Sequence, residues 1–170
     1  MEEIVNKIQK SGLIQMDLAD FKPQTPIVLV DLKDVLWQGI ALKEKDFRTF
    51  IKEYDWSQYE GKAVGVYCSV DAIIPTWAFM LVISTLQNFD VPAFVGEKTE
   101  VEKQLTLSNI KKFDTTEYEN GKVIIKGCSD IAHPAFAMSE LVKHIQPVVS
   151  SIMYGEPCST VPVYKKKKKR

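Results

Sequence analysis

The sequence predicts an α/β fold: a single domain with three layers, in which helices cover both faces of a mostly parallel or mixed sheet. Short, continuous apolar runs at 63–67, 91–95 and 123–125 have the length and composition of buried strands. A longer segment with helical apolar spacing follows each run. Strands that alternate with helices in this way are typical of right-handed crossovers within a parallel sheet.

Four elements are expected before residue 63. Apolar spacing predicts a helix over 3–10, and a weak alternation of apolar and polar residues predicts a strand over 13–21. A β-branched run predicts a strand over 27–30, for which antiparallel pairing with the preceding strand is one option. An amphipathic pattern predicts a helix over 43–54.

Three helices are expected after residue 63. The first is the uncharged run 72–89, which is apolar nearly all round and is therefore expected at the centre of the fold. The second covers 99–113. The third starts at Pro134, since proline is well tolerated in the first turn of a helix.

Pro147 leaves two alternatives for the segment that follows it. Apolar spacing continues through the proline, which predicts one kinked helix to about Tyr154. Alternatively the helix ends near Gln146, and 148–154 is a fourth strand. The helix would carry Cys158 away from the carboxyl edge of the sheet, whereas the strand would return Cys158 to that edge.

Length and charge set the expected domain boundaries. A chain of 170 residues, 45% of them apolar, is large enough to bury one core, and we expect a single α/β domain over 1–164. Residues 165–170 carry six positive charges and form a basic tail, expected to be solvated. The rest of the chain has 16 Lys and Arg against 22 Asp and Glu. This acidic body argues against a broad nucleic-acid surface.

The terminus, the hydropathy and the cysteines indicate a cytoplasmic protein. The amino terminus has no basic segment followed by an apolar stretch, so no secretory signal is expected. The longest uncharged run contains Pro75 and several polar residues, which favours a buried helix over a membrane span. The three cysteines are an odd and well-separated set, which disfavours structural disulfides. We therefore expect reduced thiols.

Two cysteines directly follow predicted strands. Cys68 comes after the strand 63–67, and Cys128 comes after the strand 123–125. If these strands are neighbours in the sheet, the two cysteines lie about 5 Å apart at its carboxyl edge, where α/β proteins bind ligands. A helix is expected after each cysteine, and its amino terminus would favour the reactive thiolate.

Cys158 and two further residues complete a possible metal site. Asp71 and His133 follow Cys68 and Cys128 closely in the sequence, and three thiolates with one such ligand suit zinc or an iron–sulfur cluster. Two other interpretations remain open. The three cysteines are inert core or loop residues, or Cys128 alone is a reactive nucleophile. The sequence contains no Cys-x-x-Cys pair, no phosphate-binding glycine loop and no nucleophile elbow. These motifs therefore do not help to decide between an enzyme and a binding protein.

Four motifs of the chain resemble those of a known family. They are DWSQY at 55–59, CSVDAIIPTWA at 68–78, KGC at 126–128 and SIMYGEPCSTVP at 151–162. On these motifs the chain resembles the bacterial domain-of-unknown-function family 2480, from its opening Glu-Glu-Ile-Val to Tyr164. The resemblance implies no particular reaction. It implies a loose link with iron–sulfur cluster assembly, which modestly favours the thiol interpretation.

These observations give two functional hypotheses. In the first, Cys68, Cys128 and Cys158 converge to hold a thiophilic metal or an iron–sulfur cluster, and the protein serves iron–sulfur or sulfur-handling partners. In the second, the chain is a non-enzymatic interaction module, expected to form a homodimer. An exposed aromatic residue such as Trp37 or Trp56 would then form the core of the interface.

Overall fold

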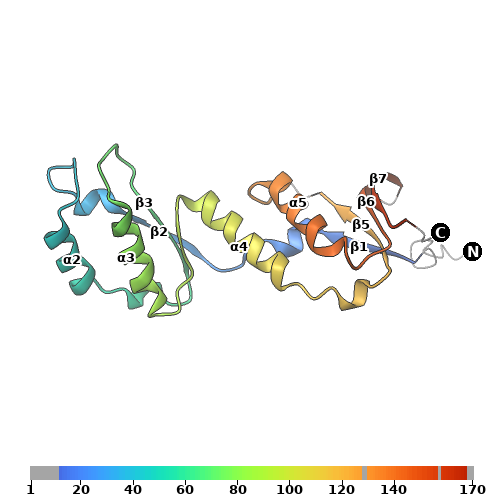
Figure 1. Ribbon diagram of the computed structural model, residues 1–170, viewed down its shortest axis with the longest axis horizontal. Coiled ribbons are helices and arrows are strands. Elements are labelled where there is room, and N and C mark those ends of the chain that lie inside the picture. The colour runs from blue at the N-terminus through green and yellow to red at the C-terminus, as the bar shows by residue number, and fades with distance from the viewer. Residues whose placement is uncertain (1–11, 128–129, 157, 168–170) are drawn as a thin grey trace, which may run out of the picture. The chain divides into compact units, whose positions relative to one another are not determined.

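The computed structural model describes residues 12–127, 130–156 and 158–167, and it confirms the α/β class (Figure 1). The chain divides into two compact units. We name the units by their place in the sequence: residues 24–104 are the inner unit, and residues 12–23 together with 105–167, which flank them in the sequence, are the outer unit. Each unit has its own sheet, whereas the sequence predicted a single sheet. The helix expected over 3–10 lies outside the described residues.

The sheet of the inner unit has three parallel strands in the order β2-β3-β4. They are β2 (Ile27–Asp31), β3 (Ala63–Tyr67) and β4 (Ala93–Val95). The option that β2 pairs antiparallel with the strand before it is wrong, because β2 pairs in parallel with β3. The preceding strand belongs to the other sheet.

Helices α2 (Glu44–Glu53) and α3 (Thr76–Gln87) cover one face of this inner sheet (Figure 1). Buried Val64 and Val66 of β3 share a core with Phe47 of α2 and with one stripe of α3. That stripe is Ala78, Val82 and Leu86. The expectation that α3 lies at the centre of the fold is wrong, because Met80 on its outer side is 66% exposed.

Helix α4 (Lys98–Lys112) begins in the inner unit and ends in the outer unit. Its buried Val101 lies on the other face of the inner sheet, where Gly65 leaves room for it. A Cβ atom built on Gly65 would lie 2.8 Å from the Val101 Cγ2 atom. Helix α4 therefore covers part of the second face of the inner sheet, on which Leu29 is still 41% exposed.

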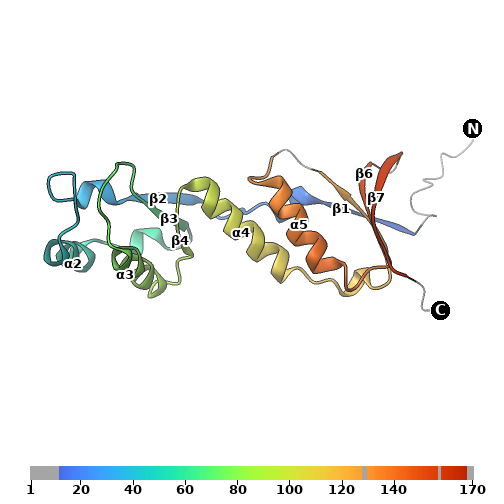
Figure 2. The same cartoon turned by 45° about the horizontal axis from the view of Figure 1, so that its top comes forward.

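The sheet of the outer unit has the order β1-β5-β6-β7, in which only β7 is antiparallel. Its strands are β1 (Leu13–Asp17), β5 (Lys122–Lys126), β6 (Ser151–Glu156) and β7 (Ser159–Lys165). Helix α5 (Pro134–Ile145) packs on one face (Figure 2). Its Leu141 and Ile145 share a core with Val123 and Ile152. Ile110 from the end of α4 joins the same core.

The segment after Pro147 forms a strand, as the second alternative predicted. Helix α5 ends at Ile145, whose carbonyl oxygen accepts hydrogen bonds from the amides of Val148 and Val149. Strand β6 then starts at Ser151 and runs parallel to β5. Cys158 therefore follows a strand that ends at the carboxyl edge of the outer sheet.

Strand β7 was not predicted, because Pro162 interrupts its β-branched pattern. Proline lacks the amide proton that a strand needs between two neighbours, and it is tolerated at a sheet edge. The described part of the outer sheet places β7 at such an edge. Lys165, assigned to the tail, is the last residue of β7 and pairs with Ser151.

Four short 3-10 helices complete the described elements. They are η1 (Leu18–Phe21), η2 (Leu32–Val35), η3 (Ser57–Tyr59) and η4 (Thr116–Tyr118). Asp17 and Asp31 cap the first two, each accepting a hydrogen bond from the amide two residues later. In the described ranges, every helix is too short or too polar to cross a lipid bilayer.

Candidate functional site

The carboxyl edge of the inner sheet holds a hollow of about 400 Å3. The three strands are parallel, so their carboxyl ends, at Asp31, Tyr67 and Val95, meet at one edge. The loops after β3 and β4 form the walls. The hollow is lined by Val66, Tyr67, Cys68, Val70, Asp71, Ala72, Ile74, Phe79, Val95 and Gly96. Cys68 and Asp71 thus line one hollow in the inner unit.

Asp31 fixes the start of the loop after β3. Its Oδ1 atom accepts hydrogen bonds from the Ser69 amide at 3.1 Å and the Lys33 amide at 3.0 Å. Burial by itself would raise the pKa of Asp31, but the hydrogen bonds from Ser69 and Lys33 lower it to about 2. Partial burial and the nearby Asp31 carboxylate raise the pKa of the Tyr67 phenol. The carboxylate therefore holds two loops together while it stays ionised.

The hydrogen bonds that the Asp31 carboxylate accepts from Ser69 and Lys33, which we call the Asp31 clamp, predict an acid-dependent loss of stability. Because the pKa of Asp31 falls from 3.8 to about 2 on folding, its contribution is present above pH 4 and is lost between about pH 4 and pH 2. For a group at the surface we expect about 1 kcal/mol from this clamp. Asp31→Asn should lower the free energy of unfolding by that amount at pH 7 and by little at pH 2, measured by urea denaturation.

The control for this experiment is Asp34→Asn, which removes a neighbouring carboxylate of η2. It should change stability by less than about 0.5 kcal/mol at both pH values. An equal loss for both variants at pH 7, or a loss from Asp31→Asn that persists at pH 2, contradicts the clamp.

The Cys68 thiol does not have the environment that the sequence predicted. Its Sγ atom donates a hydrogen bond to the Val70 carbonyl oxygen at 3.4 Å, which requires the protonated thiol. The expected helix amino terminus is also missing from its position. Helix α3 starts at Thr76, eight residues later, because a loop paired with residues 40–42 comes first.

The expectation that Cys68 and Cys128 follow neighbouring strands is wrong. Strand β3, before Cys68, has β2 and β4 as neighbours, whereas β5, before Cys128, has β1 and β6. The physical reason is that β1, for which pairing with β2 was one option, instead pairs with β5 and belongs to a second sheet. Cys128 itself lies outside the described residues.

Cys158 and His133 both belong to the outer unit. Cys158 is an exposed free thiol at the turn between β6 and β7. His133 is exposed at the amino terminus of α5, where its backbone has φ 55° and ψ 57°. Neither residue lines the hollow that contains Cys68 and Asp71. Within the described ranges, no three Cys, His, Asp or Glu side chains are placed to hold a metal ion.

Two loops next to the hollow carry exposed apolar side chains, which we call the apolar loop surface: Trp37, Ile40, Val70 and Ile73. They are 43–72% exposed. The loops are paired through their backbones, since the Ile73 amide donates to the Ile40 carbonyl oxygen at 2.9 Å and the Leu42 amide donates to the Ile73 carbonyl oxygen at 3.4 Å. Within the first loop, the Trp37 amide donates to the Ala41 carbonyl oxygen at 2.8 Å. A tight turn at Gln38 and Gly39, both with positive φ, lies between Trp37 and Ile40.

Sequence reasoning named only Trp37 of this surface. Its other candidate interface residue, Trp56, is 3% exposed and belongs to the core. The missed residues are isolated apolar side chains in loops, and neither helical nor strand periodicity identifies such positions. The available signal was Ile40 directly after a Gln-Gly pair, where a turn places its neighbours at the surface.

The chain matches a family model over almost its whole length. The family model described as "Protein of unknown function (DUF2480)" matches residues 2–166. No curated protein and no solved structure matches the chain.

Proposed function

The chain belongs to the DUF2480 family, and from that premise we propose that it is a non-enzymatic, cytoplasmic interaction module that forms a homodimer through its apolar loop surface. The observation that carries this proposal is the exposure of Trp37, Ile40, Val70 and Ile73 on two adjoining loops. Contiguous exposed apolar groups on a folded protein mark interaction sites. The free thiols of Cys68 and Cys158 are compatible with a reducing compartment.

The backbone of the apolar loop surface is ordered before any partner binds. Hydrogen bonds join Trp37 to Ala41, Ile40 to Ile73, and Leu42 to Ile73. A surface that is already ordered loses less conformational entropy on association. The hollow beside it provides a recess into which a partner's side chain can pack. Both features support the interpretation that these exposed apolar residues form a binding surface.

The charges around this surface favour a second copy as the partner. Lys43 and Asp71 belong to the same two loops as these apolar side chains, so the surface includes charges of both signs. In a two-fold dimer each patch contacts itself in the opposite orientation, and a surface of mixed charge can then pair unlike charges. The Lys43 ammonium lies 4.0 Å from the centre of the Trp37 ring, which leaves its charge beside the apolar centre.

The test is the oligomeric state of an interface variant. Ile73 is 72% exposed, so Ile73→Asp should leave the fold intact. A central interface residue contributes at least about 2 kcal/mol, so the variant should raise the dimer dissociation constant about 30-fold. Sedimentation equilibrium measures this change, with circular dichroism to verify folding.

Met80→Asp is the matched control, because Met80 is a similarly exposed apolar residue of the same unit but lies on α3. It should dimerise as the unmodified chain does. A monomeric unmodified chain contradicts the homodimer. Dissociation by Met80→Asp rather than by Ile73→Asp contradicts the choice of surface.

The second candidate is the thiol hypothesis without Cys68 and Asp71, and one observation favours it. Strands β5 and β6 are parallel neighbours, and the Lys126 ammonium lies 3.5 Å from the Glu156 carboxylate at their carboxyl ends. Cys128 and Cys158 each follow that pair by two residues in the sequence. We propose that these two thiols, with His133, hold zinc or an iron–sulfur cluster for iron–sulfur or sulfur-handling partners.

Metal analysis of anaerobically purified protein tests this second candidate. We expect zinc or iron in the unmodified chain and its loss in Cys158→Ser, while Cys68→Ser keeps the metal and serves as control. Bound metal must also raise the melting temperature, since it binds only the folded state. A metal-free protein whose melting temperature is unchanged by chelator contradicts this proposal.

A further inference from the structure

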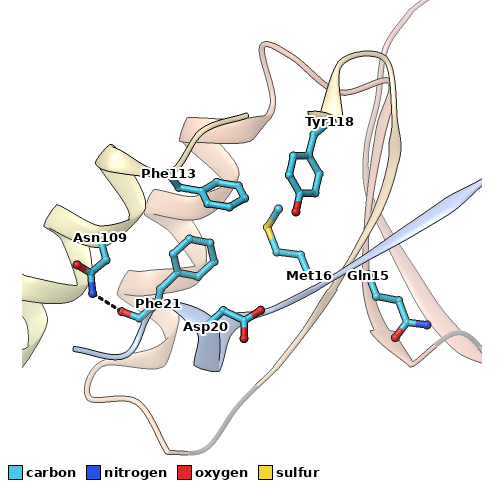
Figure 3. Close-up of a pocket in the computed structure, with 7 residues that line it drawn as sticks. All are labelled: Gln15, Met16, Asp20, Phe21, Asn109, Phe113 and Tyr118. Atoms are coloured by element: carbon cyan, nitrogen blue, oxygen red, sulfur yellow. Dashed lines mark hydrogen bonds between the residues drawn. The ribbon is translucent and has the colours of Figure 1, made fainter. Parts of the chain in front are cut away.

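The outer unit contains a second hollow, of about 200 Å3, which no part of the preceding proposals uses (Figure 3). It lies between the end of β1, the 3-10 helices η1 and η4, and the last turns of α4. The hollow is lined by Gln15, Met16, Asp20, Phe21, Asn109, Phe113 and Tyr118. All seven residues belong to the outer unit.

Three aromatic rings form a continuous wall of this hollow. The Phe21 and Phe113 rings meet edge to face, with centroids 5.2 Å apart, and the Phe113 and Tyr118 rings are 5.3 Å apart. The Met16 thioether lies beside the Tyr118 ring (Figure 3). Aromatic faces carry negative electrostatic potential and attract cations, alkylammonium groups included.

The opposite side of the hollow is polar and acidic. The Asp20 carboxylate lies below the rings in Figure 3. Both Asp20 and Gln15 are exposed. The Asn109 Nδ2 atom donates to the Phe21 carbonyl oxygen at 3.1 Å, which joins α4 to η1 at the hollow. Burial, followed by the Glu117 and Asp20 carboxylates, raises the pKa of the Tyr118 phenol. These two carboxylates make the electrostatic potential at the phenol more negative.

We propose that this hollow is a binding site for a small alkylammonium cation, which packs against the Phe21, Phe113 and Tyr118 rings while Asp20 balances its charge. The lining residues, all within the described ranges, include no lysine, arginine or histidine to balance the charge of an anion, whereas Asp20 can balance the charge of a cation. A hollow of about 200 Å3 admits a ligand of a few carbon atoms. The proposal does not depend on the apolar loop surface.

The experiment is a titration of the full chain followed by amide and indole NMR shifts. The probes are choline, n-butylammonium and 3,3-dimethylbutan-1-ol, which is the uncharged isostere of choline. We expect both cations to shift the amides of Asp20, Asn109 and Tyr118, and the alcohol to bind at least about 5-fold more weakly. A stronger response to choline indicates recognition by ring faces, whereas a stronger response to n-butylammonium indicates recognition by hydrogen-bond acceptors.

Two variants separate the carboxylate from the rings. Asp20→Asn should weaken choline binding about 5-fold, as expected for an exposed ion pair. Phe113→Leu keeps an apolar side chain but removes a ring, and should weaken it by a similar factor. Glu119→Gln is the control, since it removes one exposed negative charge from the same segment without lining the hollow. Its affinity should match that of the unmodified chain.

The three tryptophans are an internal reference, because Trp37, Trp56 and Trp77 all belong to the inner unit. Their indole signals should stay unchanged at choline concentrations that saturate the hollow. Equal binding of choline and its uncharged isostere overturns the proposal, as does the absence of shifts at the lining residues. A loss of affinity in Glu119→Gln as large as in Asp20→Asn overturns it too.

Discussion

Trp56→Ala is expected to lower the free energy of unfolding of the inner unit by about 4 kcal/mol. Its indole ring is 3% exposed and touches three neighbouring rings. The ring centroids lie 4.8 Å from Tyr54, 5.7 Å from Phe50 and 6.1 Å from Tyr59. The indole Nε1 atom also donates a hydrogen bond to the Ile51 carbonyl oxygen at 2.8 Å. Removing the ring leaves a cavity and takes a donor away from the partly buried Ile51 carbonyl oxygen.

Trp56→Phe is the matched variant for this prediction. It keeps an aromatic ring in the cluster but removes the indole N–H donor, so we expect a loss of about 2 kcal/mol. Urea denaturation followed by far-ultraviolet circular dichroism measures both variants. A loss below 1 kcal/mol for Trp56→Ala would show that this residue is a surface residue, as the interface hypothesis assumed.

Gly65→Ala is expected to lower the free energy of unfolding by about 3 kcal/mol. A Cβ atom at this position would lie 2.7 Å from the Gly96 carbonyl oxygen, 2.7 Å from Leu29 Cδ2 and 2.8 Å from Val101 Cγ2. Gly65 lies in the central strand β3, which is paired on both sides, so the backbone has little room to move. The added methyl group therefore forces β4 and α4 away from the sheet.

Gly127→Ala is the matched control, because there the three atoms nearest to the added Cβ all belong to the end of the Tyr154 side chain. Tyr154 is 46% exposed and can rotate outward, so we expect a loss of about 1 kcal/mol. The same denaturation experiment compares the two alanine variants. If Gly127→Ala proves the more costly, the close packing of α4 on β3 is not a main source of stability.

The strands and helices with strong periodicity were predicted well from the sequence. Strand β3 was predicted with its observed bounds, and α2 within one residue at each end. Their apolar patterns are local properties of short segments. Strand pairing is not local. Residues 13–17 pair with 122–126, although the whole inner unit separates the two segments in the sequence. Nothing in either segment encodes that choice of partner.

The candidate site was predicted only in part, because strand pairing is not encoded locally. The position of Cys68 and Asp71 at a carboxyl edge follows from one strand and one loop, and the structure has it. The convergence of Cys68 with Cys128 required one shared sheet, and β3 and β5 belong to different sheets. The burial of Trp56 depends on a reversal of the chain after α2, where Tyr54 leaves the helical conformation with ψ 138°.

The pairing of β1 with β5 has a consequence for how the chain is made. Leu13 and Lys122 are 109 positions apart, whereas Val64 and Ala93 are only 29 apart. Closing the longer loop costs about 1 kcal/mol more entropy, and every strand of the inner sheet leaves the ribosome before β5 does. The inner unit can therefore fold during synthesis, while β1 waits without its neighbour. Early termination after residue 104 should leave a folded inner sheet and an orphaned amino-terminal strand, the part of the nascent chain that most needs a chaperone.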